Sequence, residues 1–170
     1  MIIVRHPTYK NLLKWRNKFL RTLEHSYKKS PYFEEVYNLI ADVLKRDFTS
    51  IADFANESVI KISNYLGITT KFVCSSSEYP DTKSLDRESR LIEIIKRNNA
   101  VCYINPIGGQ ELYTKESFFK NGIELSFIKS KQLIYKQFDN EFLPWLSIVD
   151  VLMFNSLEEI NSMLDQYELL

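Results

Sequence analysis

The sequence is poor in the residues that mark several common classes of protein. It has two histidines and two cysteines among 170 residues, and Cys74 and Cys102 do not form a C-x-x-C pair. A zinc site, a thioredoxin-like motif and a disulfide framework are therefore not indicated, and a reduced cytoplasmic setting is favoured. We expect both cysteines to be buried at strand ends, where cysteine behaves as a small hydrophobe. No motif indicates a metal or a cofactor.

Net charge and long apolar runs are also missing. Lys plus Arg equals Asp plus Glu at 22 each, so no basic excess indicates binding to nucleic acid or to an anionic membrane. No apolar run approaches the ~18 residues of a membrane span. Only four glycines occur, without a repeat or a low-complexity tract, while 45% of the residues are hydrophobic. These features predict one domain over residues 1–170 with a single core.

The first third of the chain has helical periodicity. From residue 11 to residue 29, apolar side chains recur at three- and four-residue steps, which predicts a helix. Ser30 and Pro31 predict the N-cap and the first residue of a second helix. Ser50 predicts the N-cap of a third helix, and Gly67 its C-terminal cap.

After this point short β-rich runs alternate with helical segments. Residues 69–74, 100–104 and 123–128 are predicted strands, and a helix over 86–98 separates the first two. A helical crossover makes those two strands parallel and places the loops that follow them at one edge of the sheet, where ligands bind in α/β folds. The predicted fold class is α/β, with a helix-rich first third followed by a small parallel sheet with crossover helices.

Three further helices complete the expected order. Thr114 predicts the N-cap of a short helix over 115–120, residues 140–154 predict a longer helix, and a capping box at Ser156–Glu159 predicts the start of the last one. Three strands are few for so many helices. We therefore expect residues 1–5 to add a strand, or the chain to lack part of a larger fold.

The two loops at the predicted sheet edge hold the first candidate site residues. Ser75 and Ser76 offer hydroxyl groups to a ligand, although serine is also ordinary in loops. Gly108 and Gly109 follow the second strand; they indicate either a close approach of backbone to phosphate or a tight turn with positive φ.

Charged residues supply the remaining candidates. Asp150 lies inside an apolar helical run, where a carboxylate needs partners, so it either fixes a loop or faces a ligand. Arg90, on the crossover helix, either meets phosphate or carboxylate or lies on a solvated face. His25 is either a general base or a residue that complements a helix dipole, and His6 is a weaker candidate. As a group without individual roles, the candidate substrate-binding residues are Ser75, Ser76, Arg90, Gly108, Gly109, Tyr113 and Asp150.

Four stretches and one dipeptide resemble the WbqC-like protein family. They are residues 23–33, 65–73, 90–103 and 146–152, together with Trp15–Arg16. The resemblance covers residues 11–155, and the order and spacing of the stretches are specific to the family.

The chain also departs from the family's pattern. It lacks the opening His-Gln-Pro motif, for which His6–Pro7 is not a substitute. It has Ile104–Pro106 where the family has Ser-Gly, and Ser156–Leu157 where the family has a glycine. The chain thus resembles the C-terminal two-thirds of a family member.

The resemblance implies a role in O-antigen or capsule biosynthesis, as a glycine or other aminoacyl transferase acting on a glycan or a nucleotide sugar. The alternative is a truncated, non-catalytic binding or assembly module, which forms a homodimer or binds a partner subunit through a face that the missing segment leaves uncovered. A fragment that folds poorly is the third reading. The expected partners are a small-molecule or glycan substrate, without nucleic acid and without a membrane span.

Overall fold

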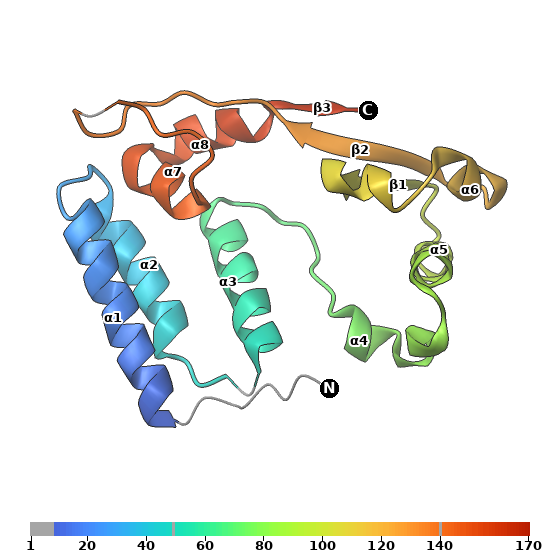
Figure 1. Ribbon diagram of the computed structural model, residues 1–170, viewed down its shortest axis with the longest axis horizontal. Helices are drawn as coiled ribbons and strands as arrows, with labels where there is room; N and C mark the ends of the chain where they lie inside the picture. The colour runs from blue at the N-terminus through green and yellow to red at the C-terminus, as the bar shows by residue number, and fades with distance from the viewer. Residues whose placement is uncertain (1–8, 49, 140) are drawn as a thin grey trace. The chain divides into compact units, whose positions relative to one another are not determined.

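A computed structural model describes residues 9–48, 50–139 and 141–170 (Figure 1). The strand predicted over residues 1–5, and His6 with it, lie outside the described residues. The chain divides into two compact units. The helical unit comprises Met1–Thr70 and Ile134–Asn161, and the sheet unit comprises Lys71–Leu133 and Ser162–Leu170. Each unit is described by itself.

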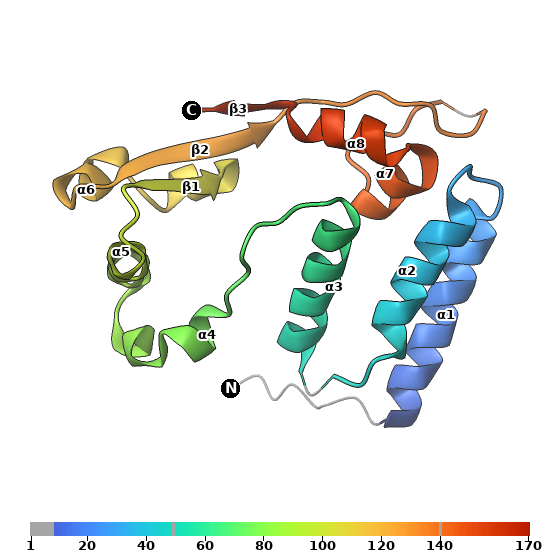
Figure 2. The ribbon, with the colours of Figure 1, turned by 180° about the vertical axis from the view of Figure 1, so that it is seen from behind.

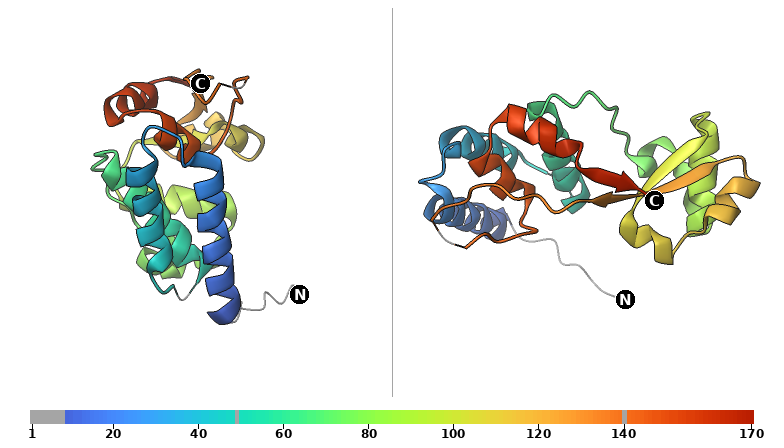
Figure 3. Two further views of the ribbon diagram at one scale, coloured as in Figure 1. Left: turned by 90° about the vertical axis from the view of Figure 1, so that its left-hand side faces the viewer. Right: turned by 90° about the horizontal axis from the view of Figure 1, so that it is seen from above.

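The helical unit is built around three helices of the first third of the chain. These are α1 (Tyr9–Tyr27), α2 (Phe33–Lys45) and α3 (Ile51–Tyr65), and α2 contacts both of the others (Figures 1 and 3). Later in the chain, α7 (Ile148–Phe154) also packs on α2, and α8 (Leu157–Leu164) follows it.

The core of the helical unit joins segments far apart in the sequence. Apolar residues of α1 and α2 meet residues of α7 and α8, since each helix presents one apolar stripe that must be buried against another helix. The buried residues of this core are Leu23, Phe33, Val36, Ile40, Leu44, Leu66, Leu152, Met153 and Ile160. The periodicity in residues 11–29 therefore predicted the helix correctly, and Leu23 of its apolar stripe is buried, whereas Trp15 is 45% exposed.

Local capping signals mostly act as predicted. The Ser50 hydroxyl accepts a hydrogen bond from the Asp53 N–H at 3.1 Å, and Gly67 ends α3 with φ of +74°. Ser156 and Glu159 form the expected capping box. The prediction for Ser30 is wrong. Tyr32 precedes α2, and the Ser30 hydroxyl instead donates to the Tyr27 carbonyl oxygen at 2.7 Å, so that it closes the preceding turn.

The sheet unit holds a three-stranded mixed sheet in the order β1-β2-β3. β1 (Cys102–Pro106) and β2 (Glu124–Ser130) are parallel, and β3 (Tyr167–Leu169) is antiparallel to β2 (Figure 2). Cys102 is paired with Glu124 and Pro106 with Ile128. The connection between the parallel strands runs through η2 (Ile107–Glu111) and α6 (Lys115–Lys120). The fold class is therefore α/β, with helices predominating, as predicted.

One helix covers the apolar side of this sheet. α5 (Arg87–Arg97) begins at Asp86, whose carboxylate accepts from the Glu88 and Ser89 N–H groups. Ile95 of α5 is buried in the same cluster as residues of α6 and β2. The buried residues of this second core are Ile95, Tyr113, Phe118, Ile123, Leu125 and Phe127. Upstream of α5, the chain forms the short helices α4 (Ser75–Glu78) and η1 (Pro80–Ser84).

Two of the predicted elements are wrong in whole or in part. Residues 69–74 form no strand, and Phe72 and Val73 are 41% and 44% exposed. Among the described residues their β-propensity has no neighbouring strand to pair with, and propensity without pairing does not make a strand. The parallel pair is therefore β1 with β2, and the chain before α4 is not part of the sheet.

The predicted helix over 140–154 is confined to its second half. The backbone around Pro144 is irregular, and Trp145 has φ of +59°, a left-handed conformation that interrupts a helix. α7 begins only after Ser147, whose hydroxyl accepts from the Val149 N–H at 3.2 Å. Ser147 is thus a cap that the periodicity did not reveal. Within the described residues, no helix combines the length and apolar character needed to cross a membrane.

Candidate functional site

The centre of the candidate site in the helical unit is the buried carboxylate of Asp150. The residue lies in the first turn of α7 and is 4% exposed. Oδ1 accepts from the Tyr135 hydroxyl at 2.6 Å and from Gln137 Nε2 at 2.9 Å, and Oδ2 accepts from the Tyr27 hydroxyl at 3.1 Å. These donors offset the cost of removing a charge from water.

The two tyrosines that face Asp150 are held in their neutral form. Burial, together with the nearby Asp150 charge and its hydrogen bond, raises the pKa of Tyr27 to about 12. The same causes raise the pKa of Tyr135. Both hydroxyl groups therefore remain protonated donors at neutral pH, and neither supplies a base there.

A groove opens beside this network on the surface of the helical unit. It has a volume of about 450 Å³ and lies at the C-terminal turn of α1. The residues that line the groove are Glu24, His25, Ser26, Lys28, Lys29 and Phe138. A smaller pocket of about 180 Å³ shares Ser26 and Phe138 with the groove and reaches Tyr27, Gln137 and Asp150. The pocket at Asp150 and the groove thus share part of their lining.

The groove combines an imidazole with two ammonium groups. Lys28 is paired with Glu24 at 3.4 Å, whereas no carboxylate of the described residues pairs with Lys29. His25 is exposed in the last turn of α1, at the rim of the hollow. The aromatic ring of Phe138 completes the lining. Such a mixture of charged groups and an aromatic wall suits a polar ligand with an anionic part.

The remaining predicted site residues belong to the sheet unit, and two of them meet there. Arg90 Nη2 lies 3.4 Å from both the carbonyl oxygen and the hydroxyl of Ser75. Arg90 Nε donates to Thr82 Oγ1 at 3.1 Å. Ser76 is exposed, and its hydroxyl lies 3.2 Å from the Cys74 sulfur. Ser75, Ser76 and Arg90 therefore form one cluster, although no strand carries the serines.

The paired glycines and Tyr113 form a second group. Gly109 accepts a backbone hydrogen bond from the Tyr113 N–H at 3.0 Å, and Tyr113 belongs to the core of the sheet unit. Neither glycine has positive φ, so that explanation of the pair is wrong. Gly109 is required for space, because a Cβ atom there would lie 2.2 Å from Asn105 Oδ1. A Cβ atom on Gly108 would meet nothing within 4 Å.

The predicted single cleft is not formed in the way expected. α4, with its serines, and the turn after β1 lie apart within the sheet unit (Figures 1 and 3). The cause is the missing strand over 69–74, without which the two loops do not share a sheet edge. Asp150 belongs to the other unit. The seven residues thus form two groups within the sheet unit, with Asp150 in the helical unit, and ligand contact by each remains a prediction.

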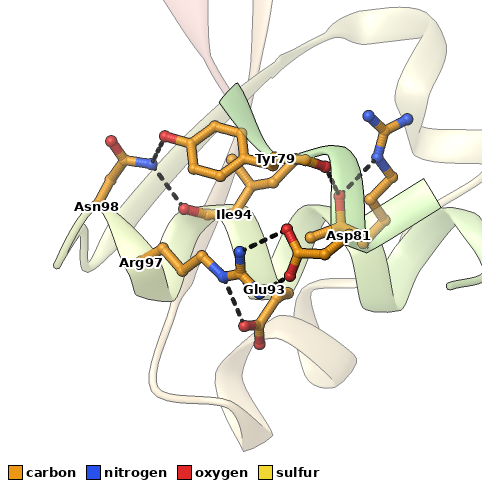
Figure 4. A network of polar contacts seen from close by, with 8 residues as sticks. Tyr79, Asp81, Glu93, Ile94, Arg97 and Asn98 are labelled. Carbon is orange, nitrogen blue, oxygen red and sulfur yellow. Dashed lines mark hydrogen bonds and ion pairs between the residues drawn. The ribbon is translucent and has the colours of Figure 1, made fainter. Parts of the chain in front are cut away.

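A polar network beside the Arg90 cluster has a structural role. Arg97 makes two hydrogen bonds to Asp81, at 2.6 and 3.0 Å, and one to Glu93 at 2.8 Å (Figure 4). The bonds from Arg97 lower the pKa of the Asp81 carboxyl. Asn98 Nδ2 donates to the Tyr79 hydroxyl and the Ile94 carbonyl oxygen, both at 2.7 Å (Figure 4). These bonds attach η1 and the residue before it to α5.

The expected burial of the cysteines is wrong, since Cys74 and Cys102 are both exposed and reduced. Hydrogen bonds from Ser76 and Ser77 lower the pKa of the Cys74 thiol. In the described part of the chain, no group of three His, Cys, Asp or Glu residues is arranged to hold a metal ion.

Sequence reasoning missed four residues of the helical site. In the sequence, Tyr27 belongs to the apolar periodicity of residues 11–29, and Tyr135, Gln137 and Phe138 carry no signal. They come to Asp150 and the groove from segments as much as 123 positions away. The one available signal was Asp150 itself, since a carboxylate within an apolar run requires donors from elsewhere.

The comparisons with known proteins agree with the resemblance seen in the sequence. Neither the curated proteins nor the solved structures contain a significant match to the chain. The sequence model of the WbqC-like protein family matches residues 4–162, a range that includes α1, the sheet strands β1 and β2, and Asp150. The chain therefore belongs to the WbqC-like protein family.

Proposed function

We propose that this chain acts in the cytoplasm in the biosynthesis of a surface polysaccharide, of the O-antigen or capsule kind, and transfers glycine or another aminoacyl group to a glycan or a nucleotide sugar. Family membership supports the pathway, because the WbqC-like family is associated with such gene clusters. The groove beside Asp150 is the observation that carries the transfer. Its volume of about 450 Å³ is within the range of small-molecule sites.

The groups in the groove suit acyl transfer. The donor is an aminoacyl ester or thioester, and the acceptor is a hydroxyl or amino group of the sugar. The acceptor attacks the donor carbonyl carbon and its proton passes to His25. His25 then returns that proton to the departing oxygen or sulfur as the donor's C–O or C–S bond breaks, so that an alcohol or a thiol is released. Lys28 and Lys29 bind the anionic part of the donor or acceptor.

The Asp150 network has a supporting role in this proposal. Its three donors are held by the carboxylate, and Tyr27 and Gln137 line the smaller pocket that shares Ser26 and Phe138 with the groove. The proposal also includes ligand contact by the seven residues predicted from the sequence. Their groups are Ser75, Ser76 and Arg90; Gly108, Gly109 and Tyr113; and Asp150.

The test is a transfer assay with purified protein. Radiolabelled glycine, supplied as a thioester or as an ester, is incubated with candidate nucleotide sugars and glycans, and acid-stable label in the sugar fraction is counted. We expect transfer, and we expect His25→Ala to reduce the rate by roughly 10²-fold or more. Lys18→Ala, an exposed change on the same helix, is the matched control and leaves the rate unchanged.

Absence of transfer with every donor, while another family member transfers label in parallel, contradicts the catalytic proposal. The alternative is then a non-catalytic binding module. One observation favours that alternative: Asp150 already accepts from three donors, as expected of a carboxylate whose role is to hold the fold.

A further inference from the structure

Arg90 and Arg97 both lie on α5, but Arg90 has no carboxylate partner among the described residues. Arg97 is neutralised by Asp81 and Glu93. Among the described residues, no carboxylate lies within ion-pair distance of the Arg90 guanidinium. The neighbouring acids have other roles, since Asp86 caps α5 and Glu88 accepts from the Ser117 hydroxyl. The positive charge of Arg90 is thus not balanced locally.

The guanidinium of Arg90 is nevertheless held in place. Its Nε donates at 3.1 Å to Thr82 Oγ1, and Thr82 is 1% exposed. The Thr82 hydroxyl in turn donates to the Tyr79 carbonyl oxygen at 2.7 Å, so its orientation is set by the backbone. Nη2 lies near Ser75, and no described residue bonds to Nη1. One edge of the guanidinium is therefore fixed by protein contacts while the other remains available.

One hydroxyl group lies beside the Arg90 guanidinium. The Ser75 hydroxyl lies 3.4 Å from Nη2, and Ser76 follows it in the chain. The hydroxyl and N–H groups of Ser76 and Ser77 turn toward the Cys74 sulfur and lower the pKa of its thiol. Donors in this turn are thus arranged in a way that favours negative charge.

From this arrangement we propose that Arg90 and the Ser75 hydroxyl form a binding site for a phosphate group. A guanidinium with a free edge matches two oxygens of a phosphate, and the serine hydroxyl supplies a further donor to a third. A carboxylate has only two oxygens and leaves the hydroxyl unused. The source that we assign to this phosphate is the diphosphate of a nucleotide-linked sugar. This assignment of the source rests on the proposed function.

A purely structural role is the competing explanation. In that case Arg90 only ties α4 to η1 through Ser75 and Thr82, and its loss changes stability without changing any affinity. A binding measurement separates the two explanations, because a structural tie does not respond to phosphate.

The experiment is calorimetric titration of the full chain with inorganic pyrophosphate at low ionic strength. We expect Arg90→Gln to weaken binding roughly tenfold or more, since it removes a charged donor pair. We expect Ser75→Ala to weaken it severalfold. Arg87→Gln is the matched control; it removes the same charge from an exposed position one turn earlier on α5 and leaves the affinity within about twofold.

Separate titrations with different anions identify the ligand. Orthophosphate is expected to bind more weakly than pyrophosphate, and uridine diphosphate at least as tightly as pyrophosphate. Acetate that binds as tightly as pyrophosphate overturns the assignment to phosphate, and uridine diphosphate that binds tenfold more weakly overturns the nucleotide source. Equal affinities for the unmodified chain and Arg90→Gln, or an equal loss in Arg87→Gln, overturn the site itself.

Folding and function are kept apart in this design. If Arg90→Gln does not fold, Arg90→Lys keeps the charge without the planar fork and is expected to bind pyrophosphate more weakly, while unchanged affinity overturns the site. Phosphate binding that depends on Arg90, without any aminoacyl transfer, refutes the proposed function and leaves the site. If Arg90→Gln changes neither the aminoacyl transfer nor the binding of pyrophosphate, the site is refuted and the proposed function stands.

Discussion

The side chain of Gln137 pairs with the backbone of Leu143 as one strand residue pairs with another. Its Oε1 accepts from the Leu143 N–H at 2.9 Å, and its Nε2 donates to the Leu143 carbonyl oxygen at 3.1 Å. The same Nε2 also donates to Asp150. The irregular segment before α7 is therefore anchored to the buried carboxylate through a single amide side chain.

This anchor predicts that Gln137→Ala loosens the segment. The change removes both bonds to Leu143 and the bond to Asp150, and we expect the free energy of unfolding to fall by roughly 1–2 kcal/mol. We also expect faster proteolytic cleavage between residues 138 and 146, measured by limited digestion and mass spectrometry. Gln132→Ala, at an exposed position, is the control and is expected to change neither quantity. Equal behaviour of the two variants contradicts the anchor.

The Asp150 network predicts a large cost for removing its charge. Asp150→Asn replaces one acceptor oxygen with a donor NH₂ group that faces other donors, so at least one buried hydroxyl or amide loses its partner. We expect a loss of roughly 2–4 kcal/mol in the free energy of unfolding. The measurement is urea unfolding with hydrogen exchange at the amides of α7, which assigns the loss to the helical unit.

A matched variant separates burial from charge in that experiment. Asp42 is an exposed carboxylate that pairs with Lys45 at 3.4 Å, and Asp42→Asn is expected to cost less than about 0.5 kcal/mol. Tyr27→Phe and Tyr135→Phe should each cost about 1 kcal/mol, because the carboxylate keeps two donors. If Asp150→Asn costs no more than Asp42→Asn, the network does not support the fold.

Local features of the structure were accessible from the sequence, and contacts between distant segments were not. Ser50 and Thr114 cap their helices as predicted, because an N-cap depends on residues three positions away. The partners of Asp150 depend on how α1 and the segment around residue 135 pack, which no local pattern encodes. Residues 69–74 show the converse: their local propensity favours a strand, but the described part of the chain offers them no partner strand.

The two adjacent glycines illustrate the same limit within the candidate site. The sequence pairs Gly108 with Gly109 as if they had one role, whereas only Gly109 is packed against the Asn105 side chain. Asn105 cannot move freely, because its Nδ2 donates to the Tyr103 hydroxyl at 2.7 Å. A difference between the two positions therefore follows from packing alone.

We accordingly predict opposite outcomes for alanine at these positions. Gly109→Ala places a Cβ atom 2.2 Å from Asn105 Oδ1 and is expected to destabilise the sheet unit by roughly 1–3 kcal/mol. Gly108→Ala is expected to be neutral or to stabilise by about 0.4–1 kcal/mol, since it restricts the unfolded chain. Asn105→Ala in the Gly109→Ala background should recover part of the loss in a double-mutant cycle. Strict additivity in that cycle contradicts the steric explanation.

The exposed thiol of Cys74 provides a prediction with a defined pH dependence. Hydrogen bonds from Ser76 and Ser77 stabilise the thiolate and hold the pKa of Cys74 below its usual value. Because the thiolate is the nucleophile, the rate of alkylation rises as pH increases through the pKa and then levels off. For Cys74 this rise should occur at lower pH than for a free thiol such as N-acetylcysteine. The measurement is the rate of reaction with iodoacetamide in a Cys102→Ser background.

A single substitution can remove the Ser76 hydroxyl from the surroundings of the Cys74 sulfur. This hydroxyl lies 3.2 Å from the sulfur, so Ser76→Ala should move the alkylation profile of Cys74 toward higher pH, with slower reaction at neutral pH. The lower intrinsic nucleophilicity of a low-pKa thiolate offsets part of the rate, but not the position of the profile along the pH axis. Ser84→Ala, an exposed change on η1, is expected to leave the profile unmoved. A profile for Cys74 that coincides with that of N-acetylcysteine, or that Ser76→Ala does not move, means that the serine hydroxyls do not stabilise negative charge in this turn.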